Sequence, residues 1–180
     1  MHDIADVIRI FNACFEASYN TQLVCGEDEP LYVPASETCA YNKIIFAHGY
    51  YSSALHECAH WLIAGEERRQ QVDYGYWYVP DGRTAQQQLA FQRVEVKPQA
   101  LEWVLSMAAG FRFQFSIDNL NGEHLDMEPF KIAVRQQMLD YQTHGLPARA
   151  DMFCKALCDF YQTAHPCSVS NLYSPAEVAG

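Results

Sequence analysis

Cations are scarce in this 180-residue sequence, and no apolar run is long enough to span a membrane. There are 12 Lys and Arg against 22 Asp and Glu, which gives a formal net charge of −10 and a pI near 5.0. Phosphate binding needs clustered cations, so this balance argues against a nucleic-acid partner. The N-terminus also lacks the cationic and apolar regions of a secretory signal, and no stretch approaches roughly 18 uninterrupted apolar residues. We therefore expect a cytoplasmic protein that binds neither membranes nor nucleic acid.

Paired cysteines and glycine-rich fingerprints are missing as well. The seven cysteines form an odd set without any C-x-x-C pair, which argues against both a disulfide framework and a zinc ribbon. No G-x-G-x-x-G, P-loop or G-x-S-x-G occurs, so nucleotide binding and serine hydrolysis have no local support. The sequence therefore predicts reduced thiols and no nucleotide cofactor.

The composition that remains is that of one globular domain. Apolar residues make up 49% of the chain and charged residues 19%, which is ample for a single core. Apolar residues recur at helical spacing between glycine and proline breaks. This pattern predicts helices over residues 3–18, 53–64, 84–110, 127–144 and 148–164, with Pro98 kinking or dividing the third. Short strands are expected at residues 31–33 and 43–47, with loop over the rest of 21–41.

We thus predict a mainly α fold of the α+β class, with five or six helices and a few short strands. The compact domain should extend over residues 1–165, and residues 166–180 should form an irregular C-terminal tail.

The chemistry is carried by an H-E-x-x-H motif, in which His56 and His60 flank Glu57. In a helix, residues four apart project from one face, so both imidazoles can converge on one metal ion. Glu57 lies about 100° around the helix from His56, within reach of a water on that ion. The motif helix would then be like that of the zincins. The alternative is a histidine pair satisfied by backbone or carboxylate partners.

Two protein ligands seldom suffice for a catalytic ion, so a third should come from elsewhere. Glu95 is the first candidate, because a carboxylate between two valines on a buried helix needs a partner. Asp73 is the second candidate. The competing interpretation of Glu95 is a salt bridge with Lys97, Arg93 or Arg83.

Four residues are candidates for contacting substrate or supporting the ligands. His48 just precedes the motif helix, and Tyr76 belongs to an aromatic run that would suit a pocket wall. Asp73 and Arg83 lie on either side of that run. Each of these residues could equally serve a turn or the core.

A set of two histidines and one carboxylate is compatible with two chemistries. In a zinc hydrolase, Glu57 would take a proton from a metal-bound water that attacks a carbonyl. In a non-haem Fe(II) oxygenase, the open positions of the metal receive O₂ and substrate. The spacing of the ligands does not distinguish the two.

Resemblance to a known family adds what spacing cannot. The segment Phe46–Trp61 resembles the signature segment of the bacterial elongation factor P hydroxylase family. Further blocks are similar to the family's pattern, in the same order, within about residues 5–163: Gly26–Pro30, Val72–Tyr78, Pro80–Arg83, Val94–Leu101 and Asp118–Leu120.

This resemblance implies a cytoplasmic monooxygenase-type enzyme that hydroxylates the modified lysine of elongation factor P after a β-lysyl group has been attached. The family's metal ligands map to His56, His60 and Glu95, with Fe(II) as the first choice of metal, Zn as the second, and molecular oxygen as co-substrate. Glu57 remains a catalytic candidate, whose task in a hydroxylase would be to hold a metal-bound water or orient a ligand. The alternative function is a zinc-dependent metallopeptidase of the HExxH…E type.

Overall fold

The computed structural model describes residues 2–27, 29–72, 83–116 and 126–168. Within these residues it has five α-helices, one short 3₁₀ helix and a three-stranded sheet. The predicted α+β class is confirmed. None of the helices in the described part of the chain is long and apolar enough to cross a membrane.

The first helix leads directly into the sheet. Helix α1 (Ile4–Tyr19) begins at Asp3, whose carboxylate accepts a hydrogen bond from the amide of Ala5, and ends at Asn20 in the left-handed conformation. Strands β1 (Thr21–Cys25), β2 (Leu31–Val33) and β3 (Asn42–Phe46) form a sheet in the order β1-β3-β2. Strand β3 pairs parallel with β1 and antiparallel with β2.

Strand β1 corrects the predicted loop over residues 21–25. Along it, Thr21 and Leu23 are buried while Gln22 and Val24 are half-buried. This weak alternation is a poor strand signal by itself. The segment becomes a strand because β3, about twenty residues later, supplies its hydrogen-bonding partner.

The motif helix α2 spans Tyr51–Ile63. It starts two residues earlier than predicted, after a turn in which His48 and Gly49 both have positive φ. In the first turn, the Ser53 hydroxyl accepts a hydrogen bond from the amide of Ala47 at 3.2 Å. The helix ends at Ile63, and a 3₁₀ helix η1 (Arg68–Gln70) follows.

The remaining helices match the predicted pattern closely. Helix α3 (Ala85–Ala109) begins with a capping box between Thr84 and Gln87 and ends at Gly110 in the left-handed conformation. Pro98 lies inside α3 without dividing it. Helices α4 (Glu128–His144) and α5 (Ala148–Tyr161) follow. Of the predicted tail, residues 166–168 lie in a turn region, and residues 169–180 are outside the described part.

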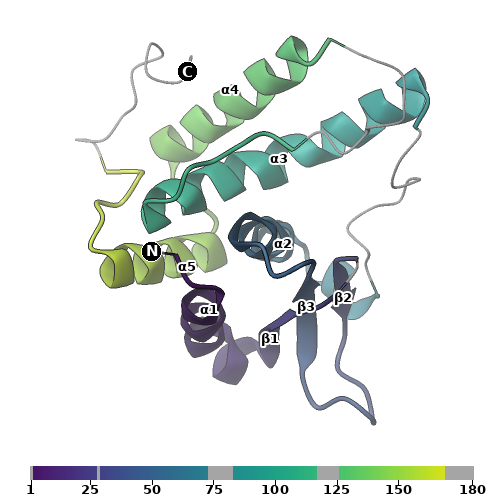
Figure 1. Ribbon diagram of the computed structural model, residues 1–180, viewed down its shortest axis with the longest axis vertical. Helices are drawn as coiled ribbons and strands as arrows, with labels where there is room; N and C mark the ends of the chain where they lie inside the picture. Colours follow the sequence, from purple (N-terminus) through teal and green to yellow (C-terminus); the bar gives the residue numbers. More distant parts are fainter. Residues whose placement is uncertain (1, 28, 73–82, 117–125, 169–180) are drawn as a thin grey trace.

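Helix α2 occupies the centre of the molecule, between α3 and the sheet (Figure 1). Helix α3 also packs against α4 and α5, and α1 covers β1. Aromatic rings of α1, α2 and α5 meet edge to face in the core around Phe11, with Trp61 and Phe153 each 5.4 Å from it. All seven cysteines are free in the structure.

Helix α3 has an unusual buried face. Residues spaced by four and three along one side of the helix are all buried and all polar: Gln88, Gln92, Glu95, Gln99, Glu102 and Ser106. Residues with this spacing share a helix face. Two members of this face, Glu95 and Glu102, lie against the motif histidines of α2.

Candidate metal centre

Three side chains of α2 and α3 converge on one point. His56 Nε2 and His60 Nε2 lie 3.1 Å apart, and the Glu95 carboxylate faces both, with Oε2 3.4 Å from His56 Nε2 and Oε1 3.2 Å from His60 Nε2. One ligand atom from each of these residues lies within 4.8 Å of the other two. Among the described residues, no other set of three His, Cys, Asp or Glu side chains brings its ligand atoms this close together.

The geometry and burial of these donors fit a metal ion. Two nitrogens bonded to one ion at about 2.1 Å each can be no more than about 4.2 Å apart, and the observed 3.1 Å satisfies this limit. Both oxygens of Glu95 are buried, and neither accepts a well-formed hydrogen bond from the described residues. An unsatisfied buried carboxylate is costly, and a cation between Glu95 and the histidines would satisfy it.

The alternative prediction for Glu95, a salt bridge with Lys97, Arg93 or Arg83, is wrong. Its carboxylate pairs with the two histidines, whereas Arg93 and Lys97 on the same helix are exposed. Arg83 is fully buried at the start of α3, where its Nε donates to Gln88 at 2.7 Å and its guanidinium lies over the Phe91 ring.

Glu102 is a member of the site that the sequence reasoning missed. Its Oε2 lies 2.8 Å from His56 Nδ1, the ring nitrogen that points away from Glu95. Glu102 follows Glu95 by seven residues, two turns of the helix, so the two carboxylates share one face of α3. That spacing was the available signal in the sequence.

The charges in this interface depend on one another. Burial alone would lower the pKa of His56, but the hydrogen bond to Glu102 and the charges of Glu95, Glu102 and Glu57 raise it to about 10. Burial alone would raise the pKa of Glu95, but the positive charges of His60 and His56 outweigh it and lower the pKa to about 2. The proton on His56 therefore offsets part of the carboxylate charge in the metal-free protein, where a metal ion could replace it.

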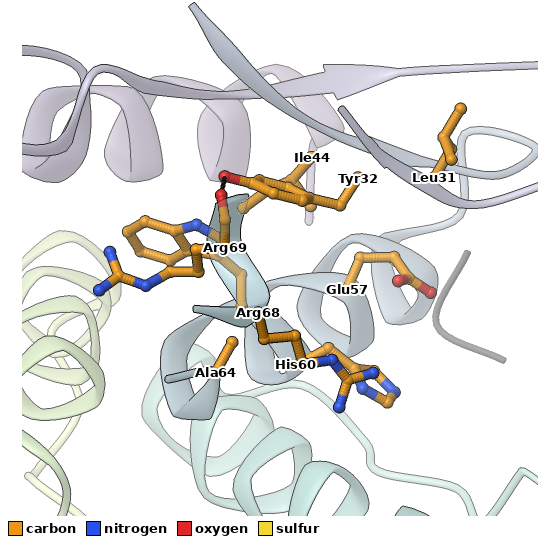
Figure 2. Close-up of a pocket in the computed structure, with 9 residues that line it drawn as sticks. Leu31, Tyr32, Ile44, Glu57, His60, Ala64, Arg68 and Arg69 are labelled. Atoms are coloured by element: carbon orange, nitrogen blue, oxygen red, sulfur yellow. Dashed lines mark hydrogen bonds between the residues drawn. The ribbon is translucent and has the colours of Figure 1, made fainter. Parts of the chain in front are cut away.

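Glu57 turns away from this cluster and lines a pocket. An open pocket lies between α2, η1 and the edge of the sheet. Glu57 and His60 contribute to one side of it, and Leu31 and Tyr32 of β2 lie across from them (Figure 2). Glu57 is buried, which raises its pKa, and its carboxylate forms no hydrogen bond or ion pair in the described part of the chain.

The other predicted site residues are not brought to the cluster. His48 is exposed before the start of α2, with its ring 5.9 Å from that of Tyr50. Arg83 packs on the first turns of α3, as described above. Asp73 and Tyr76 lie outside the described residues.

The fold and the site define a class of protein: a mainly helical domain in which two partly buried histidines and one buried carboxylate converge on a common point. Comparison with known proteins makes this specific. The family model described as Elongation factor P hydroxylase matches residues 10–172. A protein of Haemophilus influenzae named Elongation factor P lysine hydroxylase is 59% identical over 162 residues, which cover 90% of this chain and 91% of that protein. The chain belongs to the elongation factor P hydroxylase family.

Proposed function

We propose that this protein is a metal-dependent enzyme that hydroxylates a lysine of elongation factor P in the cytoplasm. The substrate would be the lysine that already carries a β-lysyl group. The observation that carries the proposal is the convergence of His56, His60 and Glu95 in a member of this family. These three residues would hold the metal.

Iron is the metal that this donor set fits best in a hydroxylase. Two histidines and a carboxylate are the ligands of non-haem Fe(II) oxygenases, in which the open positions on the metal serve O₂ and substrate. When bound, the iron would supply the activation of molecular oxygen. Zinc would fit the same donors but offers no redox chemistry, so a zinc-loaded protein should not hydroxylate.

The pocket beside His60 would receive the target side chain. Its wall includes Leu31 and Ile44 of the sheet, and these apolar surfaces suit the methylene stem of a lysine. Glu57 would then orient the target or hold a proton at the inner end of the pocket, because its buried carboxylate has a raised pKa and forms no ion pair in the described residues.

The test is mass spectrometry of β-lysylated elongation factor P after incubation with the Fe(II)-loaded protein in air. The wild type should add the mass of one oxygen atom, and His60→Ala and Glu95→Ala should abolish the gain. His144→Ala is the matched control, because this histidine is exposed on α4 and pairs with Asp140 one turn earlier; it should behave as wild type. Peptide cleavage that requires zinc and Glu57, without any oxygen gain, would replace the proposal with a metallopeptidase.

A further inference from the structure

We propose that Glu102 is a positioning residue of the metal centre, which holds the His56 ring so that its Nε2 faces Glu95 and His60. This inference rests on the proposed role of His56 as a metal ligand. Glu102 would not touch the metal or the substrate. Its effect would be exerted through His56 alone.

The first step of the argument is the orientation of the His56 ring. An imidazole has two nitrogens on opposite sides, and the structure gives each a different neighbour. Nδ1 lies 2.8 Å from Glu102 Oε2, while Nε2 lies 3.4 Å from Glu95 Oε2 and 3.1 Å from His60 Nε2. A carboxylate accepts hydrogen bonds only, so Nδ1 must donate to Glu102. The lone pair of the ring is then left at Nε2 when a metal is bound.

The second step is the burial of this contact. The side chains of His56 and Glu102 are 12% and 5% exposed. A bond between a carboxylate and an N–H in such a place is poorly screened, and it has few competing partners. A partner of this kind fixes both the tautomer and the direction of a metal-binding histidine, and its loss typically weakens metal affinity about 10–100-fold.

The third step is the difference between the two histidines. His60 lies near Glu95 and His56 through Nε2, and its Nδ1 has no hydrogen-bond partner among the residues that the structure describes. His56 is therefore the ligand that the protein orients in advance. Helix α3 supplies both carboxylates that the His56 ring bridges, Glu95 at one nitrogen and Glu102 at the other.

The face of α3 that presents them is anchored between these two residues. Gln99 donates from Nε2 to the Ser116 carbonyl at 2.7 Å and accepts from the Ser116 amide at 3.3 Å. This pair of bonds ties the middle of the polar face to the segment that follows α3. Glu95 and Glu102 lie one turn to either side of this anchored residue.

Two substitutions of Glu102 separate the effect of its hydrogen bond to His56 from the effect of its negative charge. Glu102→Ala removes the hydrogen-bond acceptor and the charge, whereas Glu102→Gln keeps an amide oxygen that can accept from Nδ1. Ser106→Ala is the matched control, because Ser106 is buried on the same face one turn further along α3. The probe is Co²⁺ alone, titrated into the full-length metal-free protein. Two quantities are measured. One is the affinity for Co²⁺, and the other is the exchangeable, paramagnetically shifted NMR signal of the His56 ring N–H in the cobalt-bound protein.

If the inference holds, Glu102→Ala binds Co²⁺ about 10–100-fold more weakly and loses the slowly exchanging N–H signal of His56. Glu102→Gln keeps the signal and loses less affinity, and Ser106→Ala matches wild type. Wild-type affinity and signal in Glu102→Ala, or equal weakening in Ser106→Ala, would overturn it. If His56→Ala binds Co²⁺ with the same affinity as the wild type, the proposed metal centre itself fails. This result is distinct from a failure of the inference about Glu102 alone.

Discussion

At the residue scale, protons on the ligands should compete with the metal. In the metal-free protein the pKa of His56 is raised to about 10, so below that pH both ring nitrogens carry a proton. An ion that bonds Nε2 must displace one of them. We expect the affinity for Co²⁺ to fall as the pH falls, by about tenfold per unit and per proton displaced. Titrations at about pH 6.5, 7.5 and 8.5, in buffers that report proton release, measure this.

A flat affinity over that range would contradict the raised pKa of His56. The matched comparison is His60→Ala, which leaves His56 and Glu102 in place. Residual binding in this variant should still release the His56 proton, although the affinity itself will be lower.

Loss of the same His56 proton should make the metal-free protein less stable as the pH rises, whereas it makes metal binding stronger as the pH rises. The folded pKa of His56, about 10, lies above the unfolded value of about 6.5. The ion pairs of protonated His56 therefore stabilise the folded protein. This contribution is fully present below the unfolded pKa and is lost as the pH rises toward the folded pKa. The free energy of unfolding in urea should be lower at about pH 9.5 than at about pH 7. His56→Ala should flatten this dependence; a wild type that gains stability with rising pH would contradict it.

At the residue scale, the sequence was sufficient to single out the three side chains that converge in the structure, and insufficient to find Glu102 beside them. Residues four apart in a helix fixed His56 and His60 on one face, and the burial of a lone carboxylate singled out Glu95. Glu102 was missed because its seven-residue spacing from Glu95 gains meaning only when α2 lies across that face of α3. Tertiary packing, not local pattern, determines which carboxylate reaches His56 Nδ1.

At the element scale, the C-terminal end of α2 depends on a residue of α5. Arg149 donates to the carbonyls of Leu62 and Ala64 at 3.0 and 2.6 Å, and its guanidinium lies 4.8 Å from the Trp61 ring centre. The last carbonyls of a helix lack internal partners, so this arginine satisfies them. We expect Arg149→Met, which keeps much of the aliphatic stem, to lower the free energy of unfolding by about 2 kcal/mol.

Urea unfolding of the metal-free protein measures this loss, and Arg149→Lys provides the graded comparison. A lysine can reach one carbonyl as a point charge but cannot present the planar fork of a guanidinium. Its stability should therefore fall between wild type and Arg149→Met. If all three proteins unfold at the same denaturant concentration, Arg149 does not support the end of α2.

The elements also show where sequence patterns are informative. Periodicity and caps predicted all five α-helices, because Thr84 and Gly110 mark the ends of α3 and the Gly145–Pro147 break separates α4 from α5. Strand β1 was not predicted, because a short half-buried strand depends on a partner distant in the sequence. Pro98 was expected to kink or divide α3, and it does not divide the helix.

At the scale of the whole molecule, metal binding should add stability without being required for folding. The apolar core extends through all five α-helices and the sheet, so the metal-free protein has a sufficient core of its own, unlike a zinc finger. The proposed metal, however, would join α2 to α3 through ligands that lie 35 residues apart, from His60 to Glu95. An ion that binds only the folded state stabilises it by mass action.

We therefore expect the protein in excess chelator to keep its helical circular dichroism and to unfold in one transition. Free Co²⁺ at a hundred times its dissociation constant should add about 2.7 kcal/mol. For a domain of this size, that corresponds to a rise in the unfolding temperature of roughly 5–10 °C. His60→Ala should lose the rise, whereas His144→Ala should keep it. A chelated protein without helical structure would mean that the ion is part of the core. An equal rise in His60→Ala would mean that the ion stabilises the protein from some other site.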